Sequence, residues 1–539
     1  MRSLAVLVFV AACSHPSAPA VTPSHVAATW KGPEILAAVP ADTPYFFGVI
    51  EPMAPDVRDQ MYAQTGVQLK KGLKKLASGE GRAALVAAAI YSEVDGADGH
   101  WSDALGIASD ARFVLYGLSA WPVMRIEVKD PVRVRELLAR VVKAGDPDLQ
   151  PRSVGRAMLY ELREKGLAVV FGVVDNQLIA SALPAAQLDR ALPAIIGTEP
   201  PARSMRDSTV LPTLLAKHRF VPATFGFADT RRVFEVLSGH GKGQFDQLAS
   251  MLDGKMTPAC QDDLGRIAAT FPRIVLGYSR VDVRGFEGAF TVETSRSVTA
   301  GLAKLHAAMP AMPAKTQPLF AFGAAVNVDA AVTWMKDSAS ALRAAPFRCD
   351  ALEPLNKSID ELASKLDQPL PPMVQGLRGF ELVIDDATVL PPSGNGHLLV
   401  AGDHIADVVH GMLAKVPQLA SLQLPASGAP MELPLSLLGV PATIKSAHFA
   451  LRPTRAVIAV GDDSSGRASG RVAAPDAHVP LMTMVFDIPK LRERFGAFMK
   501  DVDFESFSNM EAATLALDVG DDGISLEMVG TWAHRQIAR

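Results

Sequence analysis

Residues 221–235 read VPATFGFADTRRVFE, and residues 479–493 read VPLMTMVFDIPKLRE. The two stretches match at a constant offset of 258 residues, and each runs from Val-Pro through an apolar segment and an Asp into a charged amphipathic segment. The pattern predicts a β-strand that ends at Asp229 or Asp487 and a helix that begins there. An Asp in that place accepts hydrogen bonds from the free N–H groups of the first helical turn.

Three further matches occur in the same order along the chain. They pair Pro44–Gly48 with Pro318–Gly323, Asp130 with Asp403, and Leu178–Ala180 with Val457–Ala459. Chance matches would not stay collinear, so the matches indicate an internal duplication. We expect two tandem homologous halves, residues 39–314 and 315–539.

The clearest strand-and-helix unit continues from Asp130 to Gly145. Asp130 is the expected N-cap, Pro131 the first helical residue and Gly145 the exit, with one apolar face between them. We expect similar helices at Asp229, Asp329, Asp403 and Asp487, and the repetition makes these carboxylates structural rather than catalytic.

Tight turns separate alternating strands elsewhere, at Asp175-Asn176 and at Gly520–Gly523. Strands joined by such turns are antiparallel. The expected fold class is α+β, with two tandem homologous halves, each an antiparallel sheet with helices packed on one face.

The composition excludes several classes of protein. Of the 539 residues, 49% are apolar and 20% are charged, and 53 basic against 57 acidic side chains leave a net charge of -4. A disordered chain would be less apolar, and a nucleic-acid-binding protein would be basic. We therefore expect large buried cores and no nucleic-acid partner.

The N-terminus reads MRSLAVLVFVAAC, with one Arg before an apolar run from Leu4 to Ala12. As a helix the run would cover about 14 Å, less than half of the ~30 Å hydrocarbon core of a membrane. It is typical of an export signal and too short for a membrane span. An ordinary secretory signal with an incidental Cys at position 13 is one interpretation, and a lipoprotein signal is the other.

The end of that run, Val10-Ala11-Ala12-Cys13, resembles the lipobox of bacterial lipoproteins. The resemblance implies that residues 1–12 are removed, that Cys13 is lipidated and that the lipid anchors the protein to a membrane of the bacterial cell envelope. Residues 13–38, rich in Pro, Ser and Ala at their start, would then form a flexible tether. Ser14 stands where an Asp would imply retention in the inner membrane, so the resemblance favours the outer membrane.

Cys260 and Cys349 remain as a candidate disulfide, since an even pair in an exported protein is consistent with one. Cys260 and Cys349 lie 89 residues apart, and closing a loop of that length would stabilise the fold by about 4–5 kcal/mol in a chain-entropy model. Two unpaired buried thiols are the alternative. A catalytic or metal-binding Cys has no support, because no Cys-x-x-Cys or nearby His accompanies either residue.

Catalytic signatures such as Gly-x-Ser-x-Gly, His-Glu-x-x-His and the Walker loop are missing from the sequence. Four polar clusters are explained by surface or loop structure without a bound ligand. Asp403, Asp407 and His410 would share one helix face that could present a metal, but we interpret it as a solvated face. Residues 95–103 could form a calcium loop and residues 461–470 could hold an anion, but we interpret them as a polar loop and a linker. The lysines at 70, 71, 74 and 75 could contact anionic headgroups, but we interpret them as a solvated helix face. We predict no catalytic residue, no cofactor and no metal site.

The leading hypothesis is therefore non-enzymatic: a membrane-anchored envelope lipoprotein that binds a partner protein of the envelope or acts as a scaffold. A carrier or sensor of an apolar ligand is the second hypothesis, suggested by the apolar content. The third is an enzyme of a class without a short motif, which two or three convergent polar side chains in one half, missing from the other, would favour.

Overall fold

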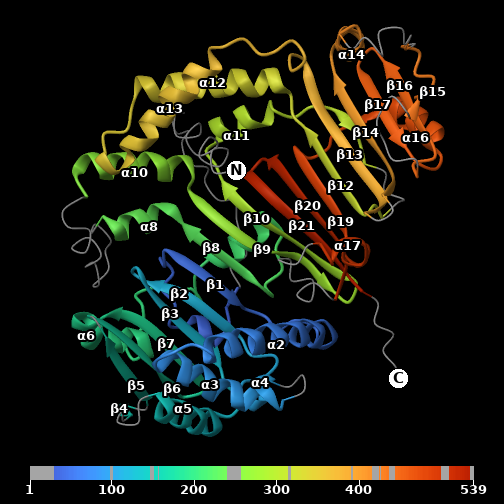
Figure 1. The fold of residues 1–539 in the computed structure, drawn as a ribbon. Coiled ribbons are helices and arrows are strands. Elements are labelled where there is room, and N and C mark those ends of the chain that lie inside the picture. The colour runs from blue at the N-terminus through green and yellow to red at the C-terminus, as the bar shows by residue number, and fades with distance from the viewer. Residues whose placement is uncertain are drawn as a thin grey trace. The chain divides into compact units, whose positions relative to one another are not determined.

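The computed structural model describes residues 30–97, 101–145, 151–155, 157–164, 166–238, 256–312, 317–389, 392–415, 424, 426–435, 443–498 and 509–533 (Figure 1). The chain folds into two compact units. We call residues 30–268 and 272–288 the first unit, and residues 269–271 and 289–533 the second unit. The predicted boundary between homologous halves, at residues 314 and 315, stays a prediction.

The first unit is an antiparallel sheet with helices. Its strands follow the order β4-β5-β6-β7-β3-β2-β1-β8-β9, and each neighbouring pair is antiparallel. Its strands are β1 (Tyr45–Val49), β2 (Phe113–Leu118), β3 (Trp121–Glu127), β4 (Arg152–Val154), β5 (Ala157–Glu164), β6 (Leu167–Val174), β7 (Gln177–Pro184), β8 (Phe225–Asp229) and β9 (Arg273–Asp282). Its helices are η1 (Glu34–Leu36), α2 (Pro55–Ala77), α3 (Arg82–Asp95), α4 (Trp101–Ala104), α5 (Pro131–Gly145), η2 (Ala185–Gln187), α6 (Leu188–Ile196), α7 (Val210–His218) and α8 (Thr230–Leu237).

The second unit is also an antiparallel sheet with helices. Its strands follow the order β15-β16-β17-β14-β13-β12-β19-β20-β21. The strands of this sheet are β12 (Phe320–Ala325), β13 (Leu377–Thr388), β14 (Ser393–Gly402), β15 (Met431–Glu432), β16 (Ala447–Arg452), β17 (Arg455–Val460), β19 (Met482–Asp487), β20 (Met510–Gly520) and β21 (Gly523–Trp532). Strands β11 (Met309–Pro310) and β18 (Asp476–Ala477) pair in a separate two-stranded antiparallel sheet. Its helices are α11 (Arg296–Ala303), α12 (Val328–Ala344), η3 (Asp350–Leu352), α13 (Glu353–Leu366), α14 (Ile405–Leu413), α16 (Ser464–Ala473) and α17 (Ile488–Phe495). Helix α10 (Pro258–Thr270) and strand β10 (Gly285–Glu293) contain the boundaries of the two units.

The α+β class and the antiparallel pairing are thus confirmed, but the prediction that helices cover one face of the sheet is wrong. In the second unit, Leu399 and Ala401 of β14 pack with Ala468 of α16 in one core cluster. Val400, between them, packs with Ile405 of α14 in another. Alternate residues of a strand point to opposite faces, so α14 and α16 cover opposite faces of this part of the sheet.

The local predictions are correct where short-range chemistry decides the structure. Asp130 Oδ1 accepts the Val132 and Arg133 N–H groups at 3.1 and 3.0 Å, at the start of α5. The predicted turn falls between β6 and β7, and its Asp175 has a φ of 50°. The second predicted turn joins β20 and β21, where Gly520 faces Gly523.

Two of the five predicted Asp N-caps are wrong. Asp229 and Asp487 cap α8 and α17 by accepting N–H groups three residues ahead, at 3.1 and 2.9 Å. The cap of α12 is instead Asn327, whose Oδ1 accepts the Ala330 N–H at 3.0 Å. Asp329 lies in the first turn of that helix and accepts the Gly376 N–H. Asp403 precedes the N-cap of α14 and pairs with Arg378, at 2.9 Å.

Residues 461–470 are not a linker, contrary to the sequence interpretation. They form a turn at Gly461, with a φ of 88°, followed by most of α16. Ala468 of that helix is fully buried, so the segment belongs to the core. Its small residues allow the helix to lie close to the sheet, which the sequence interpretation took for loop composition.

Candidate functional site

The predicted lipidation residue, Cys13, lies outside the described residues. Cys260 and Cys349 are both buried, at 3% and 5% exposure, the first in α10 and the second at the N-cap of η3. Burial suits a disulfide as well as the alternative of two buried thiols, so the pairing stays a prediction.

The predicted solvated face of α14 holds no convergent ligand set. Asp403 contacts Arg378, Asp407 lies 3.8 Å from His404, and His410 Nε2 lies 3.1 Å from the Leu424 carbonyl oxygen. Three different partners therefore occupy the three side chains.

The other polar clusters behave as surface groups. The loop at 95–103 lies partly outside the described residues, and its Asp103 pairs with Lys129 at 3.5 Å. The lysine cluster lies on α2, where Lys71, Lys74 and Lys75 are exposed and Lys70 donates to the Asp95 carbonyl at 3.0 Å.

A pocket of about 280 Å³ lies within the second unit, and its walls come from strands far apart in the sequence. It is lined by Met309, Pro310, Ala311, Met312, Gly323, Ala324, Ala325, Phe380, Glu381, Val479, Pro480, Thr483, Thr514 and Ala516. Eleven of these fourteen residues carry no polar side chain, and Glu381 is the only ionisable one. A concave, mostly apolar lining with one or two polar groups is the usual character of a small-molecule site.

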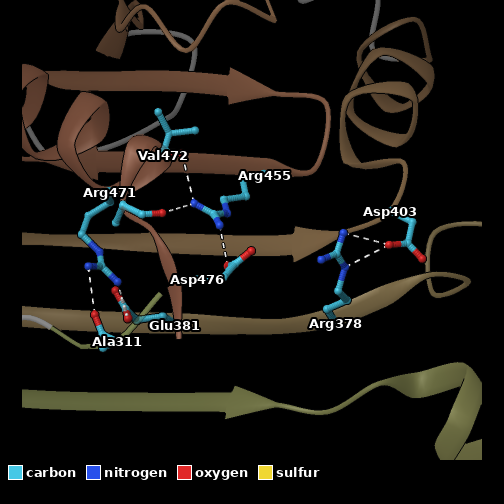
Figure 2. Close-up of polar contacts among 9 residues, drawn as sticks. Ala311, Arg378, Glu381, Asp403, Arg455, Arg471, Val472 and Asp476 are labelled. Atoms are coloured by element: carbon cyan, nitrogen blue, oxygen red, sulfur yellow. Dashed lines mark hydrogen bonds and ion pairs between the residues drawn. The ribbon is translucent and has the colours of Figure 1, made fainter. Parts of the chain in front are cut away.

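Glu381 belongs to a buried ion cluster behind that wall. One carboxylate oxygen, Oε1, lies 2.6 Å from His397 Nε2, and the other, Oε2, accepts from Arg471 at 2.7 Å. The side chains of Glu381 and His397 are each 3% exposed, and that of Arg471 is 12% exposed. Figure 2 shows Arg471 reaching from α16 both to Glu381 on β13 and to the backbone oxygen of Ala311, 3.1 Å away.

The strand register explains why Glu381 and His397 meet. Glu381 faces Leu399 across β13 and β14, and His397 faces Val383. The two residues are therefore diagonal neighbours on one face of the sheet, which is the face that α16 covers. A buried carboxylate needs paired, hydrogen-bonding partners to offset its lost hydration, and each oxygen here has one.

A second arginine fixes the end of α16 beside this cluster. Arg455 on β17 donates to the backbone oxygens of Val472 and Ala474. It also pairs with Asp476, and Figure 2 shows Arg455 beside Val472 and Asp476. A cation at the carbonyl end of a helix is favourable because those oxygens carry partial negative charge. Arg455 therefore holds the helix that supplies Arg471.

A serine–histidine pair in the same unit is structural. Ser464, the first residue of α16, lies 2.8 Å from His448 Nδ1 and 2.7 Å from the Ser446 hydroxyl. The residue is only 1% exposed. A nucleophile must reach its substrate, so we interpret this deeply buried hydroxyl as a contact that links α16 to β16 rather than as an attacking group.

Sequence reasoning missed the pocket and the ion cluster. Glu381 has the same strand parity as the buried Val383, and an acidic residue at an inward position of an apolar strand is a usable signal. No short motif contains the cluster, because the partners of Glu381 are 16 and 90 residues away in the sequence.

No family model, no curated protein and no solved structure matches this chain. Among the described residues, no helix has the length and apolarity that crossing a membrane requires.

Proposed function

We propose that the protein is a lipid-anchored binding protein of the bacterial envelope, built from two homologous halves, and that the second unit holds a small apolar ligand. Of the hypotheses that the sequence leaves open, the ligand carrier has the most direct support. The observation that carries it is the apolar pocket with one buried carboxylate at its wall.

The anchor rests on the sequence MRSLAVLVFVAAC. Replacing Cys13 with Ala should release the protein from membranes, since the lipid is the only anchor proposed. Fractionation of cells that express either form measures this. Retention of the variant in the membrane fraction would contradict the anchor without touching the ligand proposal.

The duplication is supported by the register of the two sheets. In the first unit Phe46 on β1 faces Phe227 on β8, and in the second unit Ala321 on β12 faces Val485 on β19. Phe227 and Val485 are 258 residues apart, the offset of the longest sequence match. Phe46 and Ala321 differ by 275, one of the offsets between the Pro44–Gly48 and Pro318–Gly323 segments.

The strand orders correspond as well. β1 lies between β2 and β8, as β12 lies between β13 and β19, and β3 pairs with β7 as β14 pairs with β17. The Leu178 match is one residue out of register, because the ladders align Ile179 with Val457. Three of the four collinear matches lie on strands with the same neighbours, which favours descent of both units from one ancestral unit.

The same register shows where the units differ. Gly48 faces Val114 in the first unit, and Gly323 faces Glu381 in the second, so Val114 is the counterpart of Glu381. Val123 is likewise the counterpart of His397. Both valines are fully buried. The ion cluster is thus a feature of the second unit, which supports a specialised role for its pocket rather than a shared scaffold role.

Ligand binding can be tested by native mass spectrometry of the purified full chain and by titration with an apolar fluorescent dye. We expect co-purified ligand or saturable dye binding. Ala324→Leu, which fills the pocket, should weaken binding, and Ala139→Leu, on the exposed face of α5, should leave it unchanged. A chain that carries no ligand and binds no dye would overturn the carrier proposal and return the partner-binding scaffold to first place.

A further inference from the structure

His306, His478 and Asp518 converge within the second unit although they are far apart in the sequence. One ligand atom from each residue lies within 4.8 Å of the other two. His306 Nε2 is 3.1 Å from Asp518 Oδ1, and the rings of His306 and His478 have centroids 4.7 Å apart. Imidazole nitrogens and a carboxylate oxygen are ligands that zinc accepts.

Backbone pairing fixes the positions of two of these residues. His306 forms a β-bridge with Val326, at the end of β12, and the neighbouring Ala307 N–H donates to the Ala325 carbonyl. Asp518 faces Ser525 in the β20–β21 ladder, and its Oδ1 accepts the Val519 N–H at 2.8 Å. His478 follows β18 and is exposed, so its ring is free to adjust.

The ring nitrogens of His306 have unmet hydrogen-bonding capacity, although the side chain as a whole is 12% exposed. Both ring nitrogens are shielded from solvent, and neither forms a hydrogen bond within the described part of the chain. The 3.1 Å approach to Asp518 meets the distance for an ion pair but not the angles of a hydrogen bond. A buried polar atom without a partner is unfavourable, and a bound cation would offset that loss at a coordinating nitrogen.

The distances suit one metal ion. Two ligand atoms about 2.0–2.1 Å from a tetrahedral zinc are about 3.3 Å apart, and two imidazole rings on it have centroids about 5 Å apart. The observed 3.1 and 4.7 Å are close to both values. We propose that His306, His478 and Asp518 bind a divalent transition-metal ion of the zinc class.

Three protein ligands leave coordination positions open, as in catalytic rather than structural zinc sites. The site adjoins the apolar pocket along the chain: Val479 follows His478, and Ala516 precedes Asp518 on the same face of β20. The counterparts of His478 and Asp518 in the first unit are Phe220 and Ser279, so this site also belongs to the second unit alone. The metal site stands independently of the apolar ligand.

The test uses Zn²⁺ alone and the untagged, metal-stripped full chain, in competition with a fluorescent zinc indicator. We expect one equivalent to bind. His478→Ala and Asp518→Asn should each weaken binding at least about tenfold, since even indirect changes around metal ligands cost about 10–100-fold. Asn retains an oxygen for the Val519 N–H, and His478 is exposed, so both variants should fold, as circular dichroism will check. His306→Ala should weaken Zn²⁺ binding by a similar factor.

His404→Ala is the matched control, because that ring is 77% exposed on the same unit. It should leave the affinity unchanged. The proposal fails if the chain binds no stoichiometric Zn²⁺, if the ligand variants bind as tightly as the parent chain, or if the control loses as much affinity as they do. None of these outcomes depends on whether an apolar ligand is found.

Discussion

Replacing Glu381 with Val tests the buried ion cluster directly. The change leaves His397 and Arg471 facing each other without the carboxylate that accepts from both, at 2.6 and 2.7 Å. Charge-assisted hydrogen bonds contribute about 1.5–3 kcal/mol each, and breaking a buried ion pair on one side costs about 3–5 kcal/mol. We expect the free energy of unfolding of the second unit to fall by about 3–5 kcal/mol.

The triple variant Glu381→Val, His397→Val, Arg471→Met is the control. It replaces the whole cluster with apolar side chains, and two of the three changes install the residue found at the counterpart position of the first unit. Replacing an entire buried ion cluster with packed apolar groups is often neutral or stabilising. We therefore expect the triple variant to recover most of the loss, to within about 1 kcal/mol of the parent chain.

Urea denaturation followed by far-ultraviolet circular dichroism measures both variants against the parent chain. The chain has two compact units, so the transition that the variant shifts is the one compared. A single variant that loses less than about 1 kcal/mol would refute the reasoning that Glu381 is a buried, doubly paired charge. A triple variant less stable than the single one would refute the claim that the single variant loses stability because His397 and Arg471 stay buried without their carboxylate partner.

Three further predictions concern local features. Asp487→Ala should destabilise the fold by about 1 kcal/mol through loss of the N-cap of α17, whereas Asp403→Ala, at an exposed ion pair, should destabilise it by less than about 0.5 kcal/mol. Urea unfolding midpoints compare the two variants, and equal losses would contradict the assignment of the caps. Burial raises the pKa of Tyr45 to about 12, so the stability that its neutral form contributes should be present below pH 10 and be lost as pH rises from 10 through 12. Tyr45→Phe should remove this part of the pH dependence of the unfolding free energy, measured from pH 9 to 12. Cys260 and Cys349 should appear as one linked peptide in mass spectra of a non-reduced digest, and two alkylated free thiols there would contradict the disulfide.

The sequence was a good guide to structure wherever neighbours in the chain supply the interactions. The α5 helix follows from Asp130, Pro131 and a 3.6-residue apolar period, all within sixteen residues. The turn at Asp175 follows from a residue type that tolerates positive φ between two apolar runs. Asp403 shows the limit: it resembles a cap in sequence, but Arg378 on a neighbouring strand competes for its carboxylate.

The sequence did not predict which face of the sheet each helix covers. An amphipathic helix reveals that it has an apolar side but not which face of a sheet that side covers. Helices α14 and α16 both have such a side, and they pack on opposite faces. The choice depends on the direction in which the chain leaves each strand, and no local pattern records it.

The sequence alone determined the antiparallel strands, the capped helices and the order of the repeated segments, because turn chemistry, periodicity and capping act over a few residues. It also carries the prediction of the lipid anchor at Cys13. Only the tertiary structure decided that Glu381, His397 and Arg471 form one cluster and that His306, His478 and Asp518 form another. Their convergence depends on strand order and register, which bring together side chains from distant segments whose spacing in the sequence carries no signal.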